Sequence, residues 1–73
     1  MTEWVCSIEA GLFVRHSIRN YIEKIAWNNK LELDLKELKG FLESTFLISV
    51  KGDSDAIVVF STQLAEEIRR FNE

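Results

Sequence analysis

Cys6 and His16 are the only cysteine and the only histidine in this 73-residue sequence. A thiol and an imidazole can act together as a nucleophile and its general base, which is the chemistry of covalent catalysis. They are also the only soft metal ligands in the chain, and a structural zinc site takes four ligands. Whether Cys6 and His16 can act together depends on the elements that carry them.

Carboxylates offer a second kind of chemistry. Two carboxyl groups whose pKa values are pushed apart by burial can serve as a general acid and a general base. Four acidic residues are candidates for such a pair: Glu9, Glu32, Asp34 and Glu43. The run from Lys51 to Asp55 contains further aspartates, but it lacks the spacing of a calcium loop and the glycines of a phosphate loop. We interpret Asp53 and Ser54 as turn and helix-capping residues.

Hydrophobic periodicity predicts five elements to carry these groups. Three segments alternate between apolar and polar residues, as strands with one buried face do: residues 3–9, 31–36 and 43–51. Two segments carry an apolar stripe with helical spacing: residues 12–29 and 54–72. The third strand is the most apolar of the three, which predicts that it lies in the centre of the sheet.

Local signals set the ends of these elements. Gly11 and Gly40 mark connections. The Asn28–Asn29 pair ends the first helix, because asparagine tolerates the left-handed conformation that follows many helices. Leu38 breaks the alternation of the second strand, which predicts a bulge or an early turn. Residues 56–61 leave an alternative open, because this β-branched run also suits a short fourth strand.

The order strand, helix, strand, strand, helix predicts a small α+β open-faced sandwich, with two helices on one face of a three-stranded sheet. We expect the first helix to be a right-handed crossover, which leaves the first and third strands parallel and adjacent in a sheet of order 1-3-2. This is a split β-α-β arrangement of ferredoxin-like type without its last strand. Residues 1–73 are expected to form a single domain.

These elements separate the candidate chemical groups. Cys6 points into the core from the first strand as a small hydrophobe, whereas His16 points outward from the first helix. The carboxylates lie on the outer face of the sheet, where water opposes large pKa shifts and where Val5 and Leu47 are the only apolar members. We therefore predict no catalytic residue, no metal and no cofactor, and a protein that is not an enzyme. An enzyme site shared across a dimer stays open as a minor alternative.

A second face of the first helix is more informative. Aromatic and basic residues lie opposite its core stripe, and these residue types are enriched at protein interfaces. Together with Trp4 of the first strand, they form the candidate partner interface. Its residues are Trp4, Phe13, His16, Arg19, Asn20, Lys24 and Trp27. A structural alternative is also open, in which Trp27 folds back over the helix end and Phe13 tucks under the Gly40 turn.

Size favours association. A domain this small has a marginal core and often needs a disulfide, a metal or a partner. One cysteine excludes an internal disulfide. If no fourth strand exists, the first strand is a sheet edge whose unpaired backbone can bind another chain. We therefore predict a small protein-interaction module that forms a homodimer or binds another protein.

Charge and hydropathy limit the kinds of partner and the cellular location that we expect. The net charge of −3 argues against nucleic acid as the main partner. A local excess of basic residues leaves one alternative, a nucleic-acid-binding accessory domain in which Trp27 stacks on a base and four side chains contact phosphates: Arg15, Arg19, Lys24 and Lys30. The sequence contains no run of about 18 apolar residues, so we predict no membrane span and no membrane partner. The start of the sequence does not resemble a signal peptide, and one unpaired cysteine suits a reducing compartment, so we expect a cytoplasmic protein.

Overall fold

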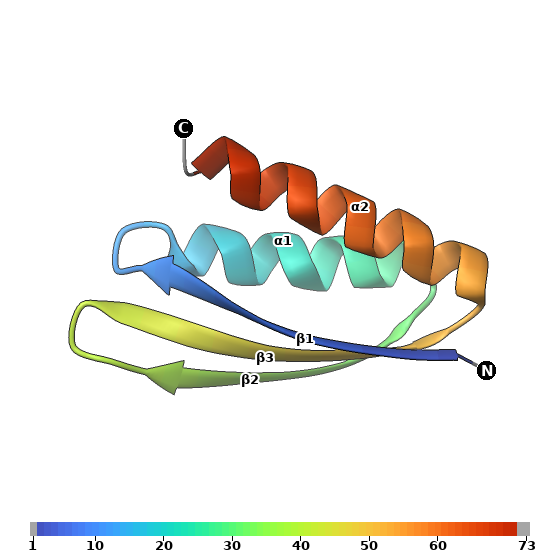
Figure 1. Ribbon diagram of the computed structural model, residues 1–73, viewed down its shortest axis with the longest axis horizontal. Helices are drawn as coiled ribbons and strands as arrows, with labels where there is room; N and C mark the ends of the chain where they lie inside the picture. Colours follow the sequence, from blue (N-terminus) through green and yellow to red (C-terminus); the bar gives the residue numbers. More distant parts are fainter. Residues whose placement is uncertain (1, 72–73) are drawn as a thin grey trace.

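The computed structural model describes residues 2–71, which form an α+β fold of three antiparallel strands and two helices. The elements follow the predicted order: β1 (Thr2–Gly11), α1 (Arg15–Asn28), β2 (Glu32–Lys39), β3 (Glu43–Gly52) and α2 (Ser54–Phe71). Both helices cover the same face of the sheet, and the other face is open (Figure 1). The sheet order is β1-β3-β2, as predicted, with the apolar β3 in the centre.

The direction of one strand differs from the prediction. β3 is antiparallel to both neighbours, so the expected parallel pairing of the first and third strands is wrong. Val50 faces Trp4 on one side and Leu33 on the other. The physical reason is the short β2–β3 hairpin, which reverses the chain and inserts β3 between β1 and β2. The crossover through α1 therefore makes β1 and β2 the parallel strands, and they do not touch.

One apolar layer fills the space between the sheet and the helices. Its fully buried side chains of largest volume are Phe46, Phe60, Ile22, Ile48 and Val50. Trp4 packs edge-on against Phe60, with 5.9 Å between the ring centroids, a geometry that aromatic pairs prefer. The core thus ties β1, through Trp4, to α2.

Residues 56–61 are helical, which decides between the two alternatives for this segment. The stripe of Ile57, Phe60 and Leu64 is buried against the sheet, as the helical spacing requires. The Asp53 carbonyl accepts the first helical hydrogen bond from the Ile57 N–H, at 3.0 Å. The predicted end of this helix at residue 72 and the side chain of Phe71 lie outside the described part of the chain.

Helix α1 begins three residues later than predicted and ends for a different reason. Residues 11–14 form a turn, closed by a 3.1 Å hydrogen bond from the Val14 N–H to the Gly11 carbonyl. At the other end the left-handed residue is Lys30, with φ of 57°, rather than either asparagine. The N–H groups of Lys30 and Leu31 each donate a 3.0 Å hydrogen bond, to the carbonyls of Trp27 and Ala26 respectively. These are the two bonds of a Schellman motif, which satisfies the last carbonyls of the helix.

The predicted bulge or early turn at Leu38 is absent. β2 continues to Lys39 in regular register, with Leu38 opposite Thr45 on the outer face and Glu37 directed inward. The parity of the side chains is therefore kept, and only their polarity is inverted. Leu38 joins Val5 and Leu47 on the outer face as a third exposed apolar residue, which the sequence pattern did not predict.

Candidate interaction surfaces

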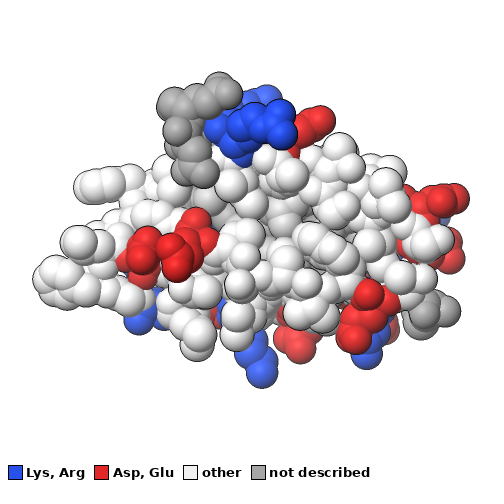
Figure 2. All heavy atoms as spheres, in the orientation of Figure 1, with Lys and Arg blue, Asp and Glu red and all other residues white. Residues whose placement is uncertain are grey.

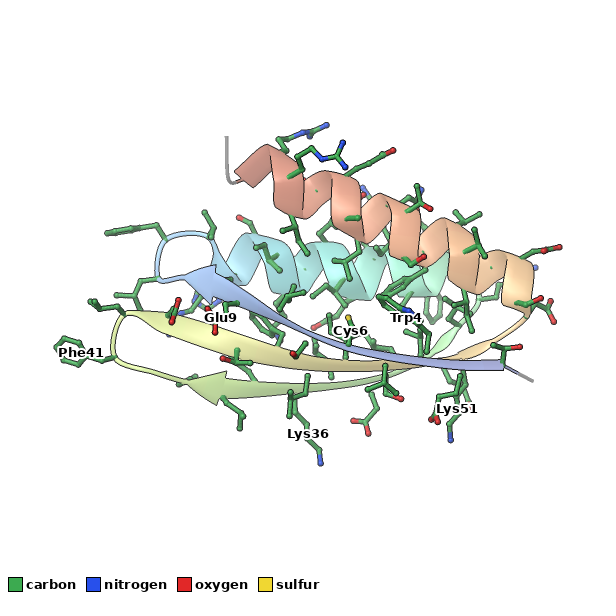
Figure 3. All side chains as sticks on the ribbon, in the orientation of Figure 1. Trp4, Cys6, Glu9, Lys36, Phe41 and Lys51 are labelled. Carbon is green, nitrogen blue, oxygen red and sulfur yellow. The ribbon has the colours of Figure 1, made fainter. Side chains whose placement is uncertain are left out.

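β1 is one of the two edge strands of the sheet. One side of β1 pairs with β3 over its whole length, and within residues 2–71 no strand covers the other side. Trp4 and Cys6 point from β1 towards the helices (Figure 3), yet they and Ile8 are only half-buried. Their cross-strand partners in β3 are fully buried: Val50, Ile48 and Phe46. The β1 side chains are less buried than these partners because, within residues 2–71, β1 has a neighbouring strand on one side only.

The other edge of the sheet, β2, is less suited to pairing. Charged residues are interspersed with leucines along β2, and Lys36 projects from this strand away from the helices (Figure 3). Charged side chains, lysine above all, protect sheet edges from accidental pairing. In β1 the central run from Trp4 to Ile8 carries no charge, and acids appear only at its ends, at Glu3 and Glu9. Of the two edge strands, β1 is therefore better suited to pairing with a strand of another chain.

The open face of the sheet is polar. A shallow hollow of about 410 Å³ at one end of it is lined by Glu3, Glu32, Leu33, Asp34, Ser49 and Lys51. Lys51 Nζ lies 3.7 Å from Glu3 Oε2, and both side chains are half-exposed, so their attraction is weakened by water. Within residues 2–71 no three His, Cys, Asp or Glu side chains lie close enough together to hold a metal ion. In the described part of the chain this face also carries no exposed aromatic ring, which an RNA-binding sheet uses to stack bases.

The structure does not bring the thiol and the imidazole together. Cys6 is half-buried on the inner face of β1, and burial raises the pKa of its thiol above the ordinary value of 9.0. The thiol is therefore protonated at neutral pH and is a poor nucleophile. His16 is exposed in the first turn of α1, and in the described chain no hydrogen bond joins it to Cys6. This arrangement offers no activated nucleophile.

The two aromatic residues predicted for one face of α1 lie at opposite ends of it. Phe13 is fully exposed (100%) in the turn before the helix, and Trp27 is 83% exposed in its last turn. Helix α1 has 14 residues and is therefore roughly 20 Å long, so its two ends lie far apart. Exposed polar residues of the predicted surface lie between them: His16, Asn20 and Lys24. Phe13 and Trp27 thus belong to two surfaces rather than to one compact patch.

Arg19, another predicted interface residue, is held by two acids. Its Nε donates a 3.3 Å hydrogen bond to Glu23 Oε1, one turn along the helix. Its Nη1 lies 3.6 Å from Glu37 Oε1, which extends from β2. These contacts offset the positive charge that the nucleic-acid alternative assigns to Arg19.

Sequence reasoning missed part of an apolar surface at one end of the molecule. Two turns meet there, residues 12–14 after β1 and residues 40–42 between β2 and β3 (Figure 1). Phe41 is 93% exposed and projects from the hairpin into solvent (Figure 3). We call the four exposed apolar side chains of these turns the apolar tip: Leu12, Phe13, Phe41 and Leu42. The available signal was Phe41-Leu42 directly after Gly40, in a hairpin turn where small and polar residues are usual.

The chain matches no protein-family model, no curated protein and no solved structure. Among residues 2–71, no helix combines the length and apolar character that crossing a membrane requires. Three exposed surfaces of the molecule are candidates for contact with a partner: the β1 edge, the apolar tip and the surroundings of Trp27.

Proposed function

We propose that this protein is a small interaction module, with no catalytic activity of its own, that self-associates through the edge of β1. The observation that carries the proposal is the open, uncharged central run of β1 beside half-buried core side chains. Adding a strand to such an edge satisfies its free N–H and C=O groups and covers the exposed sides of Trp4, Cys6 and Ile8. A second copy of β1 supplies a strand of matching length and polarity.

The pairing we propose is antiparallel, around a two-fold axis perpendicular to the sheet. It joins two three-stranded sheets into one sheet of six strands and keeps all helices on the same face. The inner side chains of both edge strands then meet over one continuous apolar layer. A homodimer of this kind supplies the additional core that a chain of this size needs.

Fold type and location complete the proposal. The sheet order β1-β3-β2, with α1 connecting the parallel strands β1 and β2, supports a ferredoxin-like split β-α-β without its last strand. A single cysteine, whose pKa is raised by burial, suits the cytoplasm, where thiols stay reduced. Cell fractionation tests the location, and recovery of the protein outside the cytoplasm would contradict it.

Sedimentation equilibrium over a range of concentrations tests the β1 edge. Val5 lies on the outer face of β1 and is 65% exposed, so Val5→Lys places a charge at the edge without disturbing the core. We expect the wild-type chain to form dimers and Val5→Lys to be at least about tenfold weaker in association, since edge lysines oppose strand pairing.

Val58→Lys is the matched control, because Val58 is 61% exposed on α2 and the substitution changes the charge equally. Val58→Lys should associate as the wild type does. A wild-type chain that stays monomeric at all concentrations contradicts the proposal. Equal weakening by both substitutions assigns the effect to net charge and also contradicts it.

A further inference from the structure

The apolar tip protrudes at one end of the longest dimension of the molecule, which is 36 Å. Its two turns lie side by side because Gly11, at the end of β1, pairs with Glu43, at the start of β3. In Figure 2 the outermost atoms on the left, at the tip, are uncharged, and the charged side chains are set back from them. The tip is therefore a convex apolar surface rather than a groove.

The tip is large for an exposed apolar patch and small for a protein interface. Phe13 and Phe41 alone expose roughly 300–500 Å² of aromatic surface, at about 150–250 Å² for each such side chain. The largest apolar patch on a typical monomer is about 300–600 Å² and often marks an interaction site. A stable protein–protein interface, however, takes about 800 Å² from each partner. A lipid bilayer sets no such threshold, because binding strength grows with the apolar area that enters it.

The backbone of both turns is suited to contact with lipid. A 3.1 Å hydrogen bond from the Val14 N–H to the Gly11 carbonyl closes the first turn, and a 2.7 Å bond from the Gly40 N–H to the Glu43 carbonyl closes the second. A backbone group that already has a partner costs less to remove from water than a free one does. The tip can therefore leave water with part of its polar backbone satisfied.

The charges around the tip indicate which kind of lipid it suits. Four charged side chains, exposed or half-buried, surround it: Glu9, Arg15, Lys39 and Glu43. Within residues 2–71 none of the four forms an ion pair. A further acid of this end, Glu37, is directed inward and is paired with Arg19. The unpaired charges thus balance, two of each sign, and match a headgroup that carries both a phosphate and an ammonium group.

We propose that the apolar tip inserts end-on into the headgroup region of a zwitterionic lipid surface. Arg15 and Lys39 then lie beside phosphates, and Glu9 and Glu43 lie beside ammonium groups. The sequence-based prediction of no membrane partner rests on the lack of a spanning segment, and a contact at the bilayer surface needs none. This contact goes beyond the self-association proposed above and uses a different surface, the end of β1 rather than its edge.

Co-sedimentation with phosphatidylcholine vesicles tests this contact, with Val5→Lys in every protein so that β1 pairing does not contribute. The tip variant carries Phe13→Ser and Phe41→Ser. The matched control carries Trp27→Ser and Val58→Ser, which remove an exposed aromatic and an exposed aliphatic side chain elsewhere. All four side chains are at least 61% exposed, so the fold should survive, and circular dichroism checks this.

We expect the Val5→Lys parent and the control to bind the vesicles. The tip variant should need at least about tenfold more lipid for the same bound fraction, because binding follows the apolar area buried. Replacing about a fifth of the phosphatidylcholine by phosphatidylserine should change the binding of the parent by less than about twofold, since an anionic surface attracts an excess of basic residues and the tip has none.

A parent that does not bind overturns the proposal, as does a tip variant that binds as tightly as the parent. A steep rise in binding with phosphatidylserine contradicts the zwitterionic preference. Sedimentation equilibrium of the parent without lipid adds a further check. Self-association that the tip variant loses would also overturn the proposal, because it assigns the tip to a second copy. None of these results depends on the wild-type comparison that tests the β1 edge, so the two proposals fail separately.

Discussion

Ser44 Oγ donates a 2.8 Å hydrogen bond to Glu37 Oε2, between adjacent strands on the inner face of the sheet. Ser44 is fully buried, and Glu37 is the only acidic side chain directed inward from β2. A second oxygen of Glu37 lies 3.6 Å from the guanidinium of Arg19 on α1. These contacts allow a glutamate to occupy a position where the pattern of the strand calls for an apolar residue.

We predict that Ser44 and Glu37 are energetically coupled. Glu37→Ala leaves the buried Ser44 hydroxyl without its acceptor, which costs about 1–3 kcal/mol of unfolding free energy. Ser44→Ala should cost about 1 kcal/mol in the wild type and much less in Glu37→Ala, because the hydroxyl has then already lost its partner. Urea unfolding of the four proteins gives the double-mutant cycle, and additive effects would contradict the coupling. Glu23→Gln, at the exposed end of the Arg19 contacts, should change stability by less than about 1 kcal/mol.

The same residues show where sequence reasoning reaches its limit. Periodicity located all five elements because the core stripes, such as Ile57, Phe60 and Leu64, are set by burial. Leu38 was interpreted as a break, because the partner that tolerates Glu37 lies seven residues further on, in another strand. The predicted direction of β3 was wrong for a similar reason. It depends on the short hairpin between β2 and β3 rather than on any pattern within a strand.

A second prediction concerns Gly40 in the hairpin. A Cβ atom at Gly40 would lie 2.7 Å from the carbonyl oxygen of Glu43, which is itself fixed by a hydrogen bond from the Gly40 N–H. Gly40→Ala should therefore destabilise the protein by about 1–3 kcal/mol, in the range of substitutions that strain the backbone. Gly11→Ala is the control, because a Cβ there meets no atom within 4 Å. It should be neutral or stabilising by up to about 1 kcal/mol in urea unfolding, and equal effects at both sites would argue against a steric origin.

A third prediction follows from the left-handed conformation of Lys30. A residue with a Cβ loses about 1–2 kcal/mol in this conformation, whereas glycine adopts it freely. Lys30→Gly should therefore raise the free energy of unfolding by about 1 kcal/mol. Lys24→Gly, within α1, makes the same change of side chain and should lower it by about 1 kcal/mol. Thermal unfolding of the two variants distinguishes the positions, and destabilisation by both would contradict the Schellman cap at Lys30.

A fourth prediction concerns alkaline pH. Burial raises the pKa of the Cys6 thiol above 9.0, so the folded state holds this proton more tightly than the unfolded state does. Its contribution to stability is therefore complete below about pH 9 and is lost as the pH rises through the folded-state pKa. Burial, followed by the charge of Glu67, raises the pKa of Tyr21 above 10.0 and acts in the same direction at higher pH. Urea unfolding between pH 8 and 11 should show a smaller loss of stability in Cys6→Ala than in the wild type, and equal losses would contradict the assignment.

Some of the exposed apolar residues could be found from the sequence, and others could not. Phe13 and Trp27 were chosen from the sequence because these aromatic residues fell outside the predicted core stripe of the first helix, and Trp4 because it lies on the predicted edge strand. Phe41 was missed, since a hairpin turn has no periodicity against which an exposed residue stands out.

The last prediction concerns the register of the proposed β1 pairing. In an antiparallel pair around a two-fold axis, the residue on the axis faces its own copy, and residues equally distant from it face each other. An axis at Cys6 would place Glu3 opposite Glu9 twice, and like charges directly opposite are destabilising. An axis at Val5 or at Ser7 avoids this and keeps the inner faces of both copies together. We therefore expect the axis at one of these two residues.

Oxidative cross-linking reads the register directly, because only a cysteine on the axis faces its own copy at the distance that a disulfide requires. With Cys6 replaced by serine, either Val5→Cys or Ser7→Cys should form a covalent dimer on mild oxidation. The wild-type chain, whose only cysteine is Cys6, should cross-link much more slowly. Efficient cross-linking through Cys6 would place the charged pairs opposite each other and contradict the register. Cross-linking of Glu3→Cys as efficient as that of the two axis variants would show that the edges meet without a fixed register.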